Sequence, residues 1–208
     1  MTEKLVIALT KGRVLTDELC LLSRIGIEPK EDPHKSRKLV FETNRDDLEI
    51  MILRAADVAT YVEHGIADLG MSGKDVLLEH SGKGFYEPLD LGLGRCKIMV
   101  AGLKEEPLLP SRIRVATKFT KTAKRYYAAR GIQVDIIKLY GAMELAPVTG
   151  LAHRIVDIVE TGNTLKANGL VPMEVIADVS TRLIVNESSF KTNYNRVKLL
   201  IDSLEKEA

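Results

Sequence analysis

Short apolar runs alternate with segments of helical periodicity along nearly the whole chain. KLVIAL (4–9) has the composition of a buried strand, and residues 12–26 then place apolar side chains at helical spacing. The expected inward face of that helix comprises Val14, Leu15, Leu19, Leu22 and Ile25. Alternation of this kind is typical of an α/β protein with mainly parallel sheets.

The same alternation continues after the first helix. LVFET and LEIMIL, on either side of residues 44–47, predict a hairpin. Further strands are expected at 67–71, in FYEPLDLG and CKIMVAGL, and at 112–117, 132–141 and 182–186, with helices at 57–65, 72–80, 119–131 and 191–206. No internal repeat or flexible linker interrupts this order.

A break in the pattern near residues 92–111 predicts two lobes. Lobe I is expected to comprise residues 1–92 plus 182–208, and lobe II residues 93–181. Clefts between domains are favoured ligand sites, so we expect the ligand in a cleft between the lobes.

Composition narrows the class of protein. Lys and Arg number 30 against 29 Asp and Glu in 208 residues, and this balance argues against a dedicated nucleic-acid binder. No apolar run has membrane length and no signal peptide is visible, so we expect a soluble, cytoplasmic protein with no membrane partner. Cys20 and Cys96 are expected to be reduced packing residues. The four histidines share no metal-ligand spacing, and no protein metal site is predicted.

DIVETGNTLKANGL (157–170) carries the clearest local chemistry. A strand with one acid, Asp157, ends in Thr161-Gly162, and Asn163 or Thr164 can cap the helix that follows. Backbone N–H groups at such a helix start attract phosphate, and Gly162 permits close approach because it has no Cβ. An ordinary capped corner between a strand and a helix is the alternative interpretation, since these are common turn residues.

This turn resembles the phosphoribosyl-pyrophosphate loop. Salvage phosphoribosyltransferases carry two adjacent acids before the turn, whereas here Val156 takes the place of the first and only Asp157 remains. Seven blocks follow the order found in ATP phosphoribosyltransferases: TKGRVL (10–15), SRKLVF (36–41), ILRAADVATYVEHGIADLGMSGKDVL (52–77), DLGLGRC (90–96), RVATKF (114–119), KLYGAMELAP (138–147) and DIVETGNTLKANGL. The chain is most similar to the short form of that family.

The resemblance implies a fold and a reaction. The fold is two-lobed, like that of the type II periplasmic binding proteins. In the reaction, N1 of the ATP adenine attacks C1 of phosphoribosyl pyrophosphate, giving phosphoribosyl-ATP and pyrophosphate in the first step of histidine biosynthesis. Positioning and electrostatic stabilisation of the leaving group should dominate, with substrate-bound Mg²⁺ as the cofactor.

By the same resemblance, the cations of the matched blocks are candidates for substrate binding. Arg13 and Arg37 are expected to stabilise pyrophosphate, and Arg54 to bind substrate phosphate. Lys11 and Arg13 directly follow the first strand, where ligands of open α/β sheets collect. A surface or ion-pair role is the alternative for any single one of these residues.

Two further positions are weaker candidates. Gly73 and Lys74 lie at an expected helix start, which is a second possible anion site, although Lys74 alone is equally read as a surface lysine. Glu144 could orient a ribose or the adenine, or could simply stabilise a helix dipole.

The resemblance also implies partners. The short form works with a regulatory subunit that resembles histidyl-tRNA synthetase, in a hetero-octamer, and a homodimer of catalytic chains is expected. Two other functions stay open from the sequence. One is a non-catalytic binding protein on the same fold, and the other is a phosphoribosyltransferase that uses a free nucleobase.

Overall fold

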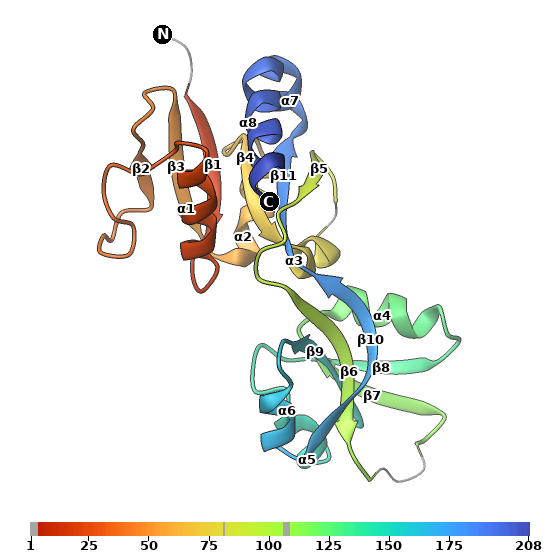
Figure 1. Cartoon of the computed structure of the whole chain (residues 1–208). Coiled ribbons are helices and arrows are strands. Elements are labelled where there is room, and N and C mark those ends of the chain that lie inside the picture. The colour runs from red at the N-terminus through yellow and green to blue at the C-terminus, as the bar shows by residue number, and fades with distance from the viewer. Residues whose placement is uncertain (1–3, 81, 106–108) are drawn as a thin grey trace. The chain divides into compact units, whose positions relative to one another are not determined.

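In the computed structural model, which describes residues 4–80, 82–105 and 109–208, the chain divides into two compact units. Unit 1 comprises Met1–Gly94 and Ser180–Ala208, and unit 2 comprises Arg95–Val179. Each unit is built on its own sheet (Figure 1). The sequence places these limits after residue 92 and before residue 182, two residues from the limits at 94 and 180.

Unit 1 holds a six-stranded sheet with the order β2-β3-β1-β4-β11-β5. Its strands are β1 (Leu5–Thr10), β2 (Val40–Glu42), β3 (Leu48–Leu53), β4 (Leu69–Gly73), β5 (Phe85–Asp90) and β11 (Thr181–Asn186). Its helices are α1 (Leu15–Arg24), α2 (Ala55–Glu63), α3 (Lys74–Glu79), α7 (Glu187–Thr192) and α8 (Tyr194–Glu207).

Two cores cover the two faces of this sheet, because successive residues of a strand point to opposite sides. Leu5, Ile7 and Leu9 of β1 pack with buried side chains of α1 and α8. Ala8, on the opposite face, packs with the buried side chains of α2. The central strand β1 is thus covered on both sides by packed side chains.

Unit 2 holds a five-stranded sheet with the order β10-β6-β9-β7-β8. Its strands are β6 (Cys96–Leu103), β7 (Arg112–Thr117), β8 (Gln133–Lys138), β9 (Arg154–Val159) and β10 (Leu170–Val179). Its helices are α4 (Thr120–Ala128), α5 (Leu145–Val148) and α6 (Asn163–Ala167). One face of the sheet packs against α5 and α6 through a core that includes Ala116, Ala146, Ile155 and Leu165.

The α/β class is confirmed, but both sheets are mixed rather than mainly parallel. In unit 1, β1 is parallel to β3 and β4, whereas β2, β5 and β11 pair antiparallel with their neighbours. In unit 2, β7 is parallel to β8 and β9, whereas β6 pairs antiparallel with β9 and β10. Strand β11 comes late in the sequence and returns to unit 1, and β10 and β6 form a long antiparallel pair. Antiparallel neighbours of this kind do not need the crossover connection that links two parallel strands.

Three details differ from the sequence-based expectations. Strand β10 was not predicted; it contains Pro172, which a sheet tolerates at its edge, where β10 lies. The C-terminal helix expected at 191–206 is two helices, α7 and α8. The buried residues of α1 are Leu15, Glu18, Leu21 and Leu22, so the inward face includes an acid that the apolar pattern could not reveal.

Candidate functional site

In unit 1, candidate cations lie at the carboxyl ends of neighbouring parallel strands. Thr10 at the end of β1 is paired with Leu53 at the end of β3, and the backbone N–H of Lys11 donates to the carbonyl of Leu53 at 2.6 Å. Lys11 and Arg54 therefore leave two adjacent strands at the same edge, and both are exposed. This is the edge where ligands of open α/β sheets bind.

A pocket of about 390 Å³ beside this edge brings two predicted residues together. Lys11 and Arg37, which are far apart in the sequence, both line it. Its other lining residues are Gly12, Leu15, Pro33, His34, Ser36, Lys38, Leu39 and Ile52. Within the residues that the structure describes, neither Lys11 nor Arg37 forms an ion pair with an acidic side chain. Their charges are thus uncompensated, which favours an anionic ligand.

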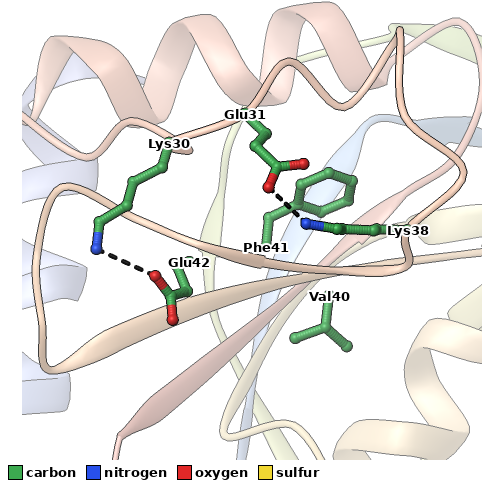
Figure 2. A pocket seen from close by; sticks show the side chains of 6 residues that line it. All are labelled: Lys30, Glu31, Lys38, Val40, Phe41 and Glu42. Atoms are coloured by element: carbon green, nitrogen blue, oxygen red, sulfur yellow. Dashed lines mark hydrogen bonds and ion pairs between the residues drawn. The ribbon is translucent and has the colours of Figure 1, made fainter.

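A second pocket of about 340 Å³ has a different electrostatic character (Figure 2). In it Lys30 pairs with Glu42 at 3.1 Å, and Lys38 pairs with Glu31. Acids thus compensate both lysines of this pocket. Lys38 lines both pockets, yet only the first contains cations without an acidic partner among the described residues.

The loop from β1 to α1 carries Arg13. Gly12 in this loop has φ +131°, a conformation that side-chain-bearing residues rarely adopt, and a Cβ added there would meet no atom within 4 Å. Backbone geometry, and not crowding, therefore requires glycine at this position. Arg13 is exposed, and Arg54 is the residue directly before α2, with an extended backbone conformation.

Gly73 and Lys74 lie where β4 passes into the six-residue helix α3. The Lys74 ammonium group contacts Glu87 of β5 at 2.7 Å, and its backbone N–H donates to the carbonyl of Ser180. An anion at this position would have to compete with both interactions. The anion role of these two residues stays a prediction, and the ion pair favours the structural alternative.

In unit 2, the turn after β9 has the form expected of a close backbone approach. Gly162 is left-handed, with φ +73°, and directly precedes α6. Asn163 and Thr164 are the first two residues of the helix, so the expectation that one of them caps it is wrong; Gly162 occupies the cap position. Thr161, Asn163 and Thr164 are exposed, and their polar groups are accessible to a ligand.

Asp157 lies within β9, and its side chain is 23% exposed. Its Oδ1 accepts a hydrogen bond from the backbone N–H of Ile158 at 2.8 Å. Lys118, which was not among the residues expected at the site, places its ammonium group 3.9 Å from the same oxygen. A cation beside Asp157 offsets the repulsion between that carboxylate and an anionic ligand.

Lys118 is held by the end of β7. The buried hydroxyl of Thr117 donates to the carbonyl of Val156 at 2.6 Å and accepts the backbone N–H of Phe119 at 2.9 Å. These bonds fix the turn that carries Lys118 against β9, one residue before Asp157. The block RVATKF contained the signal, because its polar residues directly follow a buried strand.

Glu144 lies half-buried directly before α5, close in sequence to the buried Met143. Its role in orienting ribose or adenine stays a prediction. Among the described residues, no group of three or more His, Cys, Asp or Glu side chains is arranged to hold a metal ion. Cys20 and Cys96 are not joined by a disulfide, and Cys20 is exposed, so the expectation that it is a packing residue is wrong.

Comparison with known proteins identifies the relatives of this chain. The family model described as HisG: ATP phosphoribosyltransferase matches residues 54–206. The ATP phosphoribosyltransferase of Alcanivorax borkumensis is 59% identical over 204 residues, which cover 98% of this chain and 95% of that protein. A chain of the ATP phosphoribosyl transferase (HisG:HisZ) complex from Thermotoga maritima superposes with a TM-score of 0.85 at 33% identity, covering 98% of each chain.

A more distant structure shows the fold alone. The periplasmic aliphatic sulphonate binding protein of Escherichia coli has a TM-score of 0.62 at 11% identity, covering 100% of this chain and 73% of that one. The chain therefore has the α/β fold of the type II periplasmic binding proteins, as expected. None of the helices in the described part of the chain is long and apolar enough to span a membrane.

Proposed function

The chain belongs to the HisG family of ATP phosphoribosyltransferases, and on this premise we propose that it joins ATP to phosphoribosyl pyrophosphate. N1 of the adenine attacks C1 of the ribosyl group, pyrophosphate leaves, and phosphoribosyl-ATP is the product. The observation that carries this proposal is sequence identity that extends over nearly the entire length of both this chain and its relative.

The pocket of unit 1 supports a role in binding the leaving group. Pyrophosphate departs with a high negative charge, and Lys11 and Arg37 line a pocket in which no acid compensates them. We assign Arg37 and Arg13 to stabilising that charge, because guanidinium groups bind phosphate oxygens in a bidentate manner. Lys11 and Arg54 then bind substrate phosphates at the same sheet edge.

The turn of unit 2 supports the other half of the assignment. We place the ribose 5-phosphate on Thr161–Thr164, where the left-handed Gly162 allows the backbone to approach and the two threonine hydroxyls can donate. Asp157 then accepts hydrogen bonds from the ribose hydroxyls. Lys118 lies beside it and keeps this anionic carboxylate compatible with an anionic substrate.

Catalysis in this scheme rests on electrostatics and positioning. The ribosyl carbon gains positive character while pyrophosphate gains negative charge, so fixed cations on the leaving group lower the barrier. Members of the family use a divalent metal ion, and we propose Mg²⁺ that enters bound to substrate phosphate oxygens. Mg²⁺ suits this role because it binds phosphate oxygens directly and commonly needs few protein ligands.

The HisG:HisZ complex of Thermotoga maritima supports a proposal on assembly. We propose that this chain works with a regulatory subunit of the HisZ kind, which resembles histidyl-tRNA synthetase, in a hetero-octamer containing dimers of the catalytic chain. The isolated chain should then be only weakly inhibited by histidine. Strong inhibition of the chain alone would contradict this assignment.

The assay mixes the purified chain with ATP, phosphoribosyl pyrophosphate and Mg²⁺, and analyses the products. Phosphoribosyl-ATP and pyrophosphate are expected. Product with free adenine in place of ATP would favour a nucleobase phosphoribosyltransferase. Affinity for an amino acid or small anion, with none for nucleotides, would favour a non-catalytic binding protein.

A further inference from the structure

Glu18 is an acidic residue that the proposed chemistry does not use, and it is fully buried. It lies in α1 among the apolar side chains of the unit 1 core, with an exposed fraction of 0%. An acid in such surroundings is costly unless its oxygens are hydrogen-bonded. Its carboxyl group therefore calls for an explanation.

One carboxyl oxygen bonds to the end of the central strand. Oε2 of Glu18 accepts the backbone N–H of Thr10 at 2.8 Å. The pairing of β1 with β4 extends only over Ile7 and Ala8 of β1. The Thr10 hydroxyl donates a hydrogen bond to the carbonyl of Met71 at 2.9 Å. The N–H of Thr10 thus has no partner in the sheet ladder, and Glu18 supplies one.

Glu18 also lies at the other end of the loop, in the first turn of α1. Its backbone N–H donates to the carbonyl of Val14 at 3.0 Å, which is the ordinary first bond of the helix, so its side chain ties the start of α1 to the end of β1. Between Thr10 and Val14 lie only Lys11, Gly12 and Arg13, and Lys11 is further bonded through its N–H to Leu53. Glu18 therefore closes a clasp around the three-residue loop that carries two candidate cations.

Oε1 of Glu18 is buried and has no hydrogen-bond partner among the described residues. A buried oxygen without a partner carries a desolvation cost, so the core would be more stable with an apolar residue here if Thr10 needed no acceptor. A cost of this kind indicates that the carboxyl group is not there for packing alone.

We propose that Glu18 is a positioning residue that fixes the loop of residues 11–13, so that Lys11 and Arg13 face the anionic substrate in one conformation. The inference rests on the proposed function for the roles of those two cations. The clasp itself rests only on the hydrogen bond from the Thr10 N–H to the Glu18 carboxyl group.

Three variants test it in the full chain with its regulatory subunit. Glu18→Gln keeps an oxygen acceptor for Thr10, whereas Glu18→Met keeps the length of the side chain and removes the acceptor. Leu22→Ala, one turn further along α1 and equally buried, is the control for general destabilisation of the core.

The first measurement is the hydrogen exchange of the Thr10 amide by NMR, which does not depend on activity. In Glu18→Met it should exchange about tenfold faster or more, the factor that corresponds to one lost hydrogen bond, while Glu18→Gln keeps its protection. Unchanged protection in Glu18→Met would overturn the clasp, even if the wild-type chain made no phosphoribosyl-ATP.

The second measurement is steady-state kinetics at a temperature where every variant is folded. Glu18→Met should lose about tenfold or more in kcat/KM for phosphoribosyl pyrophosphate, and Glu18→Gln should stay within about twofold of wild type. Leu22→Ala should keep its kcat/KM. Equal losses in Leu22→Ala and Glu18→Met would assign Glu18 to the core and overturn its positioning role.

Discussion

Replacing Glu18 by Gln should change how the stability of the chain depends on pH. Burial raises the pKa of the Glu18 carboxyl from 4.5 to about 8, opposed in part by the hydrogen bond from the backbone N–H of Thr10. Between these two values the folded chain binds a proton at Glu18 and the unfolded chain does not. The free energy of unfolding therefore falls as pH rises through this window.

The size of the effect follows from the two pKa values. Each pH unit in the window should cost about 1.4 kcal/mol, and the whole interval should cost on the order of 5 kcal/mol. Gln cannot ionise, so Glu18→Gln should lack this slope. Between about pH 5.5 and pH 7.5, wild type should lose about 3 kcal/mol relative to the variant.

Urea unfolding of both chains at several pH values in this range gives the difference directly. Asp17→Asn removes the adjacent exposed acid, which is only a minor cause of the raised Glu18 pKa, so it should keep most of the wild-type slope and serves as the matched control. Parallel curves for wild type and Glu18→Gln would contradict this prediction, because they would mean that Glu18 is ionised in the folded chain at neutral pH.

Three further predictions concern the candidate site. Arg13→Ala or Arg37→Ala should lower kcat more than they raise KM if the charges act on the leaving group, as measured by steady-state kinetics. Unchanged kcat and KM in either variant would indicate that the residue has only a surface role. Gly162→Val should weaken phosphoribosyl-pyrophosphate binding, because a β-branched residue at φ +73° costs about 1–2 kcal/mol, even though the nearest non-neighbouring atom would lie 3.8 Å from the new Cβ. Asn tolerates this conformation, so in calorimetric titrations Gly162→Asn should bind the substrate more tightly than Gly162→Val. Equal affinities of the two variants would contradict the prediction. Lys118→Met should raise KM for phosphoribosyl pyrophosphate, and its effect should be non-additive with that of Asp157→Asn, whereas strictly additive effects in this cycle would argue against an interaction between the two residues.

The sequence was most informative where chemistry follows a buried strand. Lys11 and Arg54 come directly after apolar runs, and the parallel pairing of β1 with β3 places both at one edge, as expected for open α/β sheets. The glycine of the turn after β9 is left-handed, a conformation that glycine adopts without the steric cost that other residues meet.

Long-range interactions explain what the sequence could not supply. No local pattern could place Arg37 in one pocket with Lys11, since that depends on how the segment before β2 folds back over the strand ends. Nor could a local pattern reveal that Glu87 forms an ion pair with Lys74, because Lys74 lies on α3 and Glu87 on β5. From the sequence, Glu18 has the pattern of an ordinary polar position of an amphipathic helix. Its burial is explained only by the end of the β1–β4 ladder, where the Thr10 N–H needs an acceptor.

The transfer of a phosphoribosyl group to ATP is the activity on which the site assignments depend. The most direct measurement incubates the chain with ATP, phosphoribosyl pyrophosphate and Mg²⁺, with and without the regulatory subunit, and follows the products by mass spectrometry. Phosphoribosyl-ATP and pyrophosphate are expected in equal amounts, with less of both formed by Arg37→Ala in the same time. No product from wild type, even with the regulatory subunit present, would contradict this activity.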